Sequence, residues 1–333
     1  MTQDNRYPAS RLAVAPMIDW TDRFCRYFHR RFSKHALLYT EMITAPALIH
    51  GDAARLLAYD QTEHPVALQI GGSDPEQLAV ATKMGVDAGY DEINLNVGCP
   101  SDRVQSGCFG AVLMKDPAVV ADCIRAIKDT AGDIPLTVKS RIGVDDQDPA
   151  AVLPEFLEKV IASGADQITI HARKAWLQGL SPKENRDIPP LDYELVYKMK
   201  AEFPDTPISI NGGITTLDEA KQHLNTMDGV MIGRAAYSNP AEILGHADTM
   251  IFNDGSVTTA EAAVHDMFNF IENELAKGTR LHQITRHMMG AFAGRPGARG
   301  WRRHLSEEAN KPNAGIETVR TALSFVEDLD MAA

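Results

Sequence analysis

The sequence predicts an α/β fold: a (β/α)8 barrel of the TIM type, followed by a C-terminal domain made only of helices. Short apolar runs rich in β-branched residues alternate with longer helical stretches, which is typical of parallel strands joined by helices. The alternation occurs eight times within about 235 residues, the size of one barrel. The strand pattern ends after Gly233. The chain of 333 residues is long enough for both parts.

Eight segments are predicted as strands, because each is a short apolar run bounded by turn or helix signals. They are Leu12–Met17, Leu37–Ile43, Val66–Ile70, Glu92–Asn96, Leu136–Ser140, Gln167–His171, Ile208–Asn211 and Gly229–Ile232. An open, doubly wound sheet of the Rossmann or flavodoxin type is the alternative. It is the weaker interpretation because no G-x-G-x-x-G turn opens a helix after any of these runs.

Helix signals separate the strands. Asp74 and Asp116 stand where an N-cap is expected, and each is followed by proline at the first helical position. Leu217–Leu224 is a further predicted helix. The segment Ala175–Pro190 is too long and polar for an ordinary connection, so we expect it to stand over the active face of the barrel.

Three amphipathic helices are predicted beyond the barrel, at Ala260–Lys277, Thr279–Phe292 and Ile316–Leu329. We therefore expect a barrel domain at residues 1–250 and a helical domain at residues 257–333. The acidic, turn-rich segment Ile251–Ser256 is the expected hinge between them.

Composition limits the environment and the chemistry. Four cysteines, Cys25, Cys99, Cys108 and Cys123, form no C-x-x-C pair, and no secretory pattern opens the chain, so a reduced, cytoplasmic protein is expected. No stretch approaches the roughly 18 apolar residues of a membrane span. Metal-ligand spacing, a G-x-S-x-G elbow and a Walker loop are all absent, so we expect no metal and no membrane partner.

Polar residues occupy the C-terminal ends of the predicted strands, which is where barrel enzymes build their sites. In chain order these ends carry Pro16 and Met17, Gln69, Asn94 and Asn96, Lys139 and Arg141, His171 and Arg173, Asn211, and Arg234. An inward Lys139 needs an anionic partner. His171 alone is a weak signal, since a lone histidine more often packs in a core.

Two glycine-bearing turns follow the last two strands, at Gly212-Gly213 and Gly233-Arg234. A single Gly-Gly usually marks only a tight turn. Two such turns, the second with an arginine, predict a phosphate site, because they free backbone N–H groups at the ends of strands 7 and 8, where barrels frequently bind phosphate.

Cys99 lies on a turn between Gly98 and Pro100, directly after a predicted strand. The other three cysteines, Cys25, Cys108 and Cys123, are predicted to be small core residues. A thiol with a reference pKa near 8.5 is mostly protonated at neutral pH, so Cys99 could act as a general acid or, once deprotonated, as a nucleophile.

Several motifs together resemble the tRNA-dihydrouridine synthases over nearly the whole chain. They are Ala15-Pro16-Met17, Leu68-Gln69-Ile70-Gly71-Gly72, Asn94-Leu95-Asn96-Val97-Gly98-Cys99-Pro100, Val138-Lys139-Ser140-Arg141, Ile170-His171-Ala172-Arg173, Asn211-Gly212-Gly213 and Gly233-Arg234. The N-L-N-x-G-C-P segment is highly specific to this family. Ser181–Arg186 and Arg295–Arg303 look like the A subfamily, whose members reduce uridines 20 and 20a in the tRNA D-loop.

The resemblance implies an FMN- and NADPH-dependent oxidoreductase. FMN would lie in the barrel mouth, where Pro16 and Met17 contact the isoalloxazine, Gln69, Lys139 and His171 bind its polar edge, and Asn211, Gly212, Gly213, Gly233 and Arg234 hold the phosphate. NADPH would reduce FMN and leave, hydride would reach C6 of an extruded uridine, and Cys99 would protonate C5. The same resemblance implies tRNA contacts at Asn96, Lys183, Arg186, Arg299 and Arg302. A monomer is expected.

Two other functions compete with this one. An FMN barrel acting on a free pyrimidine, similar to dihydroorotate dehydrogenase, would share the flavin site but would not need a basic C-terminal domain. A non-catalytic tRNA-binding protein would keep the fold, but it would not need Cys99, Lys139 and His171.

The charge balance bears on the RNA partner. With 33 Lys and Arg against 45 Asp and Glu, the net charge is −12, which at first argues against nucleic acid. The segment from Lys277 to His304 is different, because it holds seven of the cations and no carboxylate: Lys277, Arg280, Arg286, Arg295, Arg299, Arg302 and Arg303. It predicts a local RNA-binding surface, which a basic helix with Arg23, Arg26, Arg30, Arg31 and Lys34 would extend.

Overall fold

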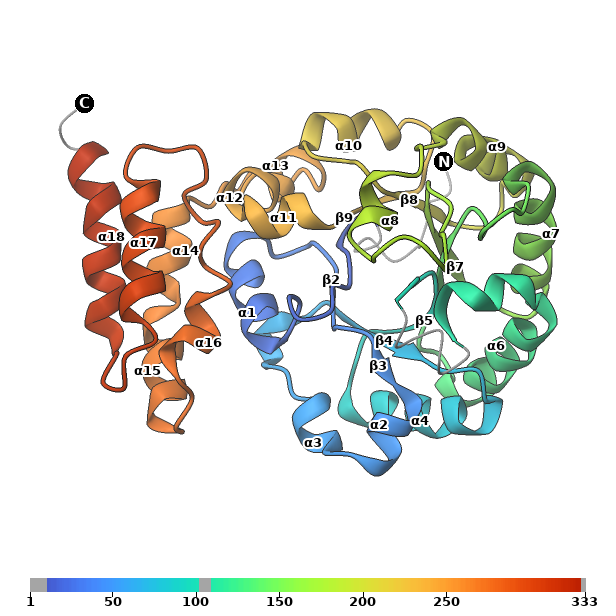
Figure 1. Ribbon diagram of the computed structural model, residues 1–333, viewed down its shortest axis with the longest axis horizontal. Helices are drawn as coiled ribbons and strands as arrows, with labels where there is room; N and C mark the ends of the chain where they lie inside the picture. The colour runs from blue at the N-terminus through green and yellow to red at the C-terminus, as the bar shows by residue number, and fades with distance from the viewer. Residues whose placement is uncertain (1–10, 102–108, 331–333) are drawn as a thin grey trace.

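The computed structural model describes residues 11–101 and 109–330, and it contains the predicted parallel barrel surrounded by helices (Figure 1). The strands are β1 (Leu12–Val14), β2 (Leu38–Tyr39), β3 (Ile43–Thr44), β4 (Val66–Gly71), β5 (Glu92–Val97), β6 (Leu136–Arg141), β7 (Gln167–His171), β8 (Ile208–Asn211) and β9 (Gly229–Ile232). The strands are hydrogen-bonded in the order β1-β9-β8-β7-β6-β5-β4-β2. A parallel bridge between Ala13 and Leu37 closes the ring.

The second predicted strand, Leu37–Ile43, is divided into β2 and β3, and both pieces pair with β4. The division falls at Thr40, whose hydroxyl accepts a hydrogen bond from the backbone N–H of Gln69 at 3.0 Å. A side chain therefore takes the place of one backbone acceptor in the ladder, and the regular pairing is interrupted for that reason. The last three strands have the predicted bounds.

The helices on the outside of the barrel begin at the predicted caps. Asp74 accepts hydrogen bonds from two N–H groups at the start of α4 (Pro75–Ala88), and Asp116 caps α6 (Pro117–Ala131). The others are α1 (Arg23–Phe32), α2 (Ala45–His50), α3 (Ala53–Leu56), α7 (Pro149–Ala162), α8 (Glu184–Asp187), α9 (Tyr193–Glu202), α10 (Leu217–His223), α11 (Arg234–Ser238), α12 (Pro240–Ile243) and α13 (Ala247–Met250). Among the described residues, no helix has the length and apolar character needed to cross a membrane.

The interior of the barrel has an apolar side and a polar side. Apolar residues gather on the side of β1, β2, β9 and the start of β4, where Ala13, Ala15, Ala67 and Met231 belong to one buried cluster. On the other side, buried polar side chains line β4 to β8: Gln69, Asn94, Asn96, Thr137, Thr169, Ser209 and Asn211. Barrel interiors are usually filled by branched apolar side chains. The polar half therefore suggests that a functional site reaches deep into this barrel.

The C-terminal part is helical, as predicted, but its helices are divided differently. They are α14 (Ala260–Asp266), α15 (Phe268–Ala276), α16 (Leu281–Thr285), α17 (Ala298–Glu308) and α18 (Ile316–Asp330). The predicted helix Thr279–Phe292 ends early, at Thr285. A Cβ at Gly290 would come within 2.5 Å of the Ser238 carbonyl oxygen, so the following turns run directly against α11. Helix α17 was not predicted.

The C-terminal helices lie beside the barrel next to α1, α11 and α12 (Figure 1). Arg23 of α1 forms an ion pair with Glu274 at 2.5 Å, and the rings of Tyr27 and Phe270 stack with centroids 3.7 Å apart. The expected hinge is tied to the barrel side, because Thr249 Oγ1 donates to the Ser256 carbonyl at 2.6 Å. The division into domains at this segment stays a prediction.

Candidate active site at the barrel mouth

The C-terminal ends of the strands form what we call the barrel mouth. Lys139 of β6 and Asn211 of β8 face each other there, and Lys139 Nζ donates a hydrogen bond to Asn211 Oδ1 at 3.1 Å. Asn211 Nδ2 donates to the Met231 carbonyl at 2.7 Å. The second bond fixes which end of the Asn211 amide faces the lysine.

The barrel mouth concentrates positive charge, and no carboxylate in the described parts of the chain forms an ion pair with Lys139 or Arg141. Burial, together with the neighbouring Arg141 guanidinium, lowers the pKa of Lys139 to about 7. Burial and the nearby Arg141 and Lys139 place the pKa of His171 well below its usual value, so His171 is neutral at pH 7. Its Nε2 atom is buried, and no hydrogen-bond partner is described for it. An anionic ligand with hydrogen-bonding groups would stabilise this arrangement.

The Gly212-Gly213 turn requires glycine at both positions. The two residues have φ values of +112° and +74°. A Cβ on Gly212 would lie 2.7 Å from the His171 ring, and one on Gly213 would lie 2.5 Å from Leu191. The turn therefore brings bare backbone against His171, where its N–H groups could face an anion.

The two helices behind the glycine turns are less open than the sequence suggested. Glu219 accepts hydrogen bonds from the N–H groups of Thr215 and Thr216, so the N-terminus of α10 is capped by its own carboxylate. Arg234 forms an ion pair with Asp187 of α8 at 2.6 Å, and both side chains are partly exposed. A phosphate bound at Arg234 would have to share the guanidinium with Asp187 or displace Asp187 from it.

Pro16, Met17 and Gly233 lie together where β1 and β9 end. Ala15 N–H donates to the Ile232 carbonyl at 2.8 Å, and a Cβ at Gly233 would lie 3.8 Å from Met17 Sδ. Pro16 and Met17 are half-buried. They form an apolar wall on the side of the barrel mouth opposite Lys139, as a flat ring would require.

Cys99 is half-buried on the turn after β5. Its N–H and that of Gly98 donate to Asn96 Oδ1 at 3.0 and 3.1 Å, and its Sγ lies 3.6 Å from Ser101 Oγ. Cys25 and Cys123 are fully buried. Cys108 lies outside the described residues. Cys99 is thus the cysteine among the described ones that borders the barrel mouth.

Arg141 was not assigned a role from the sequence, although it stands in the V-K-S-R run. It is buried, and its Nε donates to the Gly98 carbonyl at 3.1 Å. Its Nη1 donates to the carbonyls of Lys174 and Asn185 at 2.9 and 3.0 Å. Burial lowers the pKa of Arg141 to about 10. Arg141 therefore connects the Cys99 turn to the long segment 175–190.

Segment 175–190 is ordered around Asn185, which is fully buried. Asn185 Oδ1 accepts from Trp176 N–H at 2.7 Å, and its Nδ2 donates to the Trp176 carbonyl at 2.8 Å. Asn185 belongs to the short helix α8, which Lys183 precedes, and Lys183 and Arg186 are both exposed. Both cations are therefore accessible to a ligand arriving from outside the barrel mouth.

The predicted basic surface is smaller than the sequence suggested. Arg299 and Arg302 of α17 are exposed and form no ion pair with a described side chain. Four other cations of the segment are paired with carboxylates: Lys277 with Glu274, Arg286 with Asp22, Arg295 with Glu261, and Arg303 with Glu307.

Two of the five cations expected to extend the basic surface along α1, Arg26 and Arg30, are not available for it. Arg26 is buried in an ion pair with Glu63 at 2.7 Å. Arg30 is buried as well, and it donates to the carbonyls of Ser33, Ala36 and Glu63. Both guanidinium groups hold loops of the barrel in place and are not available to RNA.

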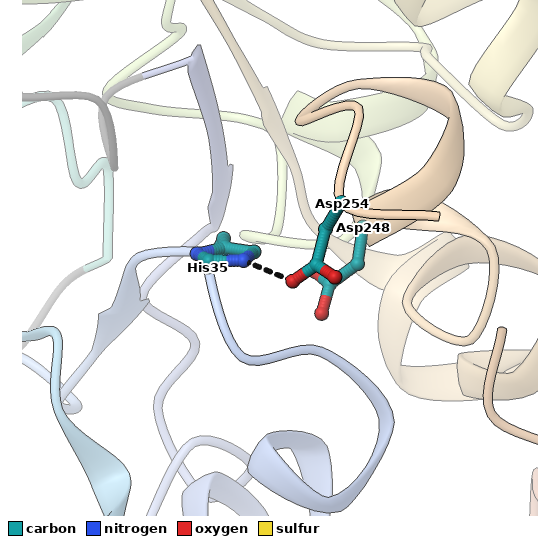
Figure 2. A group of neighbouring side chains, drawn as sticks. All are labelled: His35, Asp248 and Asp254. Atoms are coloured by element: carbon teal, nitrogen blue, oxygen red, sulfur yellow. Dashed lines mark hydrogen bonds and ion pairs between the residues drawn. The ribbon is translucent and has the colours of Figure 1, made fainter. Parts of the chain in front are cut away.

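Metal-capable side chains in the described parts of the chain gather at His35, Asp248 and Asp254 (Figure 2). His35 Nε2 lies 2.6 Å from Asp254 Oδ2. Both Asp248 oxygens already accept hydrogen bonds, one from Ser33 Oγ at 2.5 Å and one from the N–H of Lys34 at 2.7 Å. The trio ties the segment before β2 to α13 and to the segment after it, and its hydrogen bonds account for its geometry.

The residues of the barrel mouth fit a phosphate-bearing, flat anionic ligand such as a flavin nucleotide. The fit rests on His171 Nε2, which has no partner among the described residues, on the half-buried Lys139 ammonium, and on the two glycines that allow close approach. The fold and the site together define an enzyme of the parallel (β/α)8 barrel class.

Comparison with known proteins then identifies the family. The family model described as Dihydrouridine synthase (Dus) matches residues 13–327, and the chain belongs to this family. The tRNA-dihydrouridine(20/20a) synthase of Haemophilus ducreyi is 59% identical over 323 residues, which cover 97% of this chain and 99% of that protein. The protein of the same name from Yersinia pestis is 57% identical, with coverage of 96% and 93%.

Solved structures support the fold. Morphinone reductase has a TM-score of 0.52 at 11% sequence identity, and the match covers 77% of this chain and 91% of that chain. A likeness at this identity concerns the fold alone.

Proposed function

We propose that this protein reduces uridines 20 and 20a of tRNA to 5,6-dihydrouridine, with bound FMN and with NADPH as the reductant. Membership of the dihydrouridine synthase family and the names of the similar proteins support the reaction. The observation that carries the proposal is the position of Cys99, half-buried on a fixed turn beside the cationic barrel mouth. Such a thiol is suited to give a proton to a base held over the strand ends.

FMN is proposed to occupy the barrel mouth. Its candidate contacts are Pro16, Met17, Gln69, Lys139, His171, Asn211, Gly212, Gly213, Gly233 and Arg234. When bound, FMN supplies the hydride that the side chains of the protein cannot supply. Lys139 and the neutral His171 would offer one charged and one uncharged polar group to the cofactor, because both lie at the same rim.

Cys99 is proposed to protonate C5 of the uracil. Adding hydride at C6 leaves negative charge on the ring, and an acid must quench that charge in a site that excludes water. Asn96 and Arg141 hold the turn through the N–H of Cys99 and the carbonyl of Gly98, so the thiol is held in place on both sides. Asn96 is also proposed to contact the uridine through its amide, whose Nδ2 keeps one hydrogen beyond the one donated to Gln69.

The tRNA is proposed to contact Lys183 and Arg186 on segment 175–190 and Arg299 and Arg302 on α17. These four cations are exposed, as phosphate contacts require. NADPH is proposed to visit the same barrel mouth transiently, since the sequence has no dinucleotide-binding turn. A monomeric, cytoplasmic enzyme is the simplest form of the proposal.

The test compares Cys99→Ala with Cys123→Ala, a change at a buried cysteine of α6. We expect Cys99→Ala to keep FMN reduction by NADPH and to lose most dihydrouridine formation on unmodified tRNA, while Cys123→Ala keeps both. The readouts are flavin bleaching at anaerobic mixing and mapping of dihydrouridine in the product. Equal turnover by Cys99→Ala would remove the acid role. Rapid flavin reoxidation by free pyrimidine instead of tRNA would favour the competing dehydrogenase function.

A further inference from the structure

A continuous line of buried hydrogen bonds runs from Glu92, the first residue of β5, to the Cys99 turn. We call it the amide chain, and it consists of Glu92, Thr137, Asn94, Gln69 and Asn96. Thr137 Oγ1 donates to Glu92 Oε1 at 2.5 Å, and Asn94 Nδ2 donates to Thr137 Oγ1 at 2.7 Å. Gln69 Nε2 donates to Asn94 Oδ1 at 2.7 Å, and Asn96 Nδ2 donates to Gln69 Oε1 at 2.8 Å.

The amide chain ends on the backbone that carries the thiol. Asn96 Oδ1 accepts from the N–H groups of Gly98 and Cys99 at 3.1 and 3.0 Å. Three strands contribute to the chain: β4 supplies Gln69, β5 supplies the two asparagines, and β6 supplies Thr137. The hydrogen-bonding groups therefore connect the far end of the barrel interior to its mouth.

Every donor in the amide chain points the same way, and Glu92 explains why. Glu92 Oε1 accepts from both the Thr137 and the Tyr39 hydroxyl, so Thr137 gives its single hydroxyl hydrogen to Glu92 and can then only accept from Asn94. Asn94 Oδ1 is then left to accept from Gln69 Nε2, and Gln69 Oε1 is left to accept from Asn96 Nδ2. Asn96 Oδ1 is thereby turned toward the backbone N–H groups that it must bind.

The amide chain lies in the interior of the barrel. All five side chains of the amide chain are buried. Glu92 accepts from the Tyr39 hydroxyl as well, and it has no ion pair with a described Lys or Arg side chain. Burial raises the pKa of Glu92 to about 7. Burying a carboxylate whose described partners are hydroxyl groups is costly, so the presence of Glu92 at this position needs an explanation other than stability.

We propose that Glu92 is a positioning residue that sets the direction of the amide chain and so holds the Gly98-Cys99 turn in its working conformation. The catalytic consequence rests on the proposed acid role of Cys99, whereas the ordering of the turn does not. Glu92 acts at a distance, through four side chains, and touches neither cofactor nor substrate.

The test measures amide hydrogen exchange at Gly98 and Cys99 in the full chain without added cofactor. Thr137→Val keeps the shape of the side chain but removes the hydroxyl between Glu92 and Asn94, and Thr137→Ser keeps the hydroxyl. Glu92→Leu removes the acceptor, and Glu92→Gln keeps a carbonyl oxygen for both hydroxyl donors. Thr82→Val is the matched control, because Thr82 is a buried threonine of α4 whose hydroxyl has no described partner.

We expect Thr137→Val and Glu92→Leu to accelerate exchange at Gly98 and Cys99 by about tenfold, the size expected when one hydrogen bond is removed. Thr137→Ser, Glu92→Gln and Thr82→Val should exchange like the unaltered protein, and so should α4 in every variant. Unchanged exchange in Thr137→Val would overturn the proposal, and this variant decides it even if Glu92→Leu does not fold. Acceleration in Glu92→Gln equal to that in Glu92→Leu would also overturn it, because the carbonyl acceptor would then not matter.

A second measurement separates the positioning role from the acid role. In FMN-loaded protein, Thr137→Val should keep flavin reduction by NADPH and lower dihydrouridine formation about tenfold, with recovery in Thr137→Ser. If Cys99→Ala proved active, the acid role would fail, but faster exchange in Thr137→Val would still establish the positioning of the turn. Slower flavin reduction in Thr137→Val, with no change in exchange, would instead identify an effect on the cofactor site and contradict the proposal.

Discussion

Lys139 Nζ lies 3.1 Å from Asn211 Oδ1, so the half-buried ammonium donates its hydrogen bond to a neutral amide oxygen. No described carboxylate forms an ion pair with Lys139, and Arg141 adds a second positive charge nearby. The ammonium is therefore poorly compensated in the protein alone. An incoming anion would gain the interaction that Asn211 cannot supply.

The affinity for FMN should consequently fall as the pH rises above 7. The pKa of Lys139 is lowered to about 7, so the free protein loses this charge above that pH, and anion binding must then take up a proton. We expect the Kd, measured by quenching of flavin fluorescence, to rise between pH 7 and 9 by at most about tenfold for each pH unit. Lys139→Met should bind FMN weakly at every pH and show no such slope.

Lys128→Met is the control for the Lys139 experiment, because Lys128 forms a surface ion pair with Asp166 at 2.6 Å. This variant should follow the pH dependence of the unaltered protein. A slope that persisted in Lys139→Met would assign the proton uptake to another group.

The ion pair between Arg234 and Asp187 predicts opposite effects of two substitutions. Arg234→Ala should weaken FMN binding about tenfold, because it removes one charged contact to the phosphate. Asp187→Asn should tighten binding a few-fold, because it releases the guanidinium from its partner at 2.6 Å. Calorimetric titration with FMN measures both. Asp122→Asn, in an exposed pair with Arg125, should change nothing, and weaker binding by Asp187→Asn would contradict the assignment.

Gly213→Ala should give protein without bound flavin and with a lowered Tm. Gly213 has φ +74°, and its Cβ would lie 2.5 Å from Leu191 and 2.8 Å from the Tyr193 hydroxyl. Gly255→Ala is the matched control, since Gly255 has φ +79° and open space around a Cβ. The left-handed backbone costs both variants roughly 1–2 kcal/mol. The additional loss of stability in Gly213→Ala reports the collision, and yellow Gly213→Ala protein would show that the turn does not form the phosphate site.

Removing Arg299 and Arg302 should weaken tRNA binding in a salt-dependent way. The double variant Arg299→Ala/Arg302→Ala should reduce the slope of log K against log [salt] by about 0.7–0.9 for each phosphate that is no longer neutralised. Filter-binding between about 50 and 200 mM salt is suitable. Arg320→Ala, at an exposed arginine of α18 paired with Glu317, should keep the slope. An unchanged slope in the double variant would place the RNA elsewhere.

Asp22 should stabilise the protein in a pH-dependent way. It caps α1 and forms an ion pair with Arg286 of the C-terminal part at 2.7 Å. Burial alone would raise its pKa, but the interactions with His287 and Arg286 outweigh burial and lower the pKa to about 2. A lowered carboxyl pKa contributes stability that is complete above about pH 4 and is lost as the pH falls from about 4 toward 2. Asp22→Ala should therefore cost about 1–2 kcal/mol in urea unfolding at pH 7.

The cost of Asp22→Ala should be largely absent when unfolding is measured near pH 2. Asp52→Ala removes the cap of the exposed helix α3 and should cost less at pH 7, because Asp52 makes no described contact with the C-terminal helices. Equal costs for the two variants would mean that the contact with Arg286 adds nothing.

The sequence predicted the barrel well because buried parallel strands are short, continuous apolar runs. Strands β7, β8 and β9 have the predicted bounds. The break between β2 and β3 was not predictable, because it depends on the Thr40 hydroxyl replacing a backbone acceptor. Helix α17 was missed although its buried Ala298, Trp301 and Leu305 follow a helical spacing, because flanking glycines and exposed arginines obscured the pattern.

The candidate site was predictable at the level of which residues meet, because strand ends converge in any barrel. The partners of those residues were not predictable. Arg234 pairs with Asp187 from a segment 47 residues away, and Arg26 of the expected basic helix is buried with Glu63. Long-range ion pairs of this kind depend on the packed fold, and they decide which cations remain available to a ligand.

The contacts between α1 and the C-terminal helices fix the position of those helices relative to the barrel. Arg23 with Glu274, Asp22 with Arg286 and the Tyr27–Phe270 stack fasten the C-terminal helices to the helix that follows β1. The distance between α17 and Cys99 is then fixed by the packing of the protein. With the proposed RNA contacts on α17, a uridine would reach the Cys99 thiol only when the rest of the tRNA spans that spacing, so the protein would select one uridine among many by its distance along the molecule.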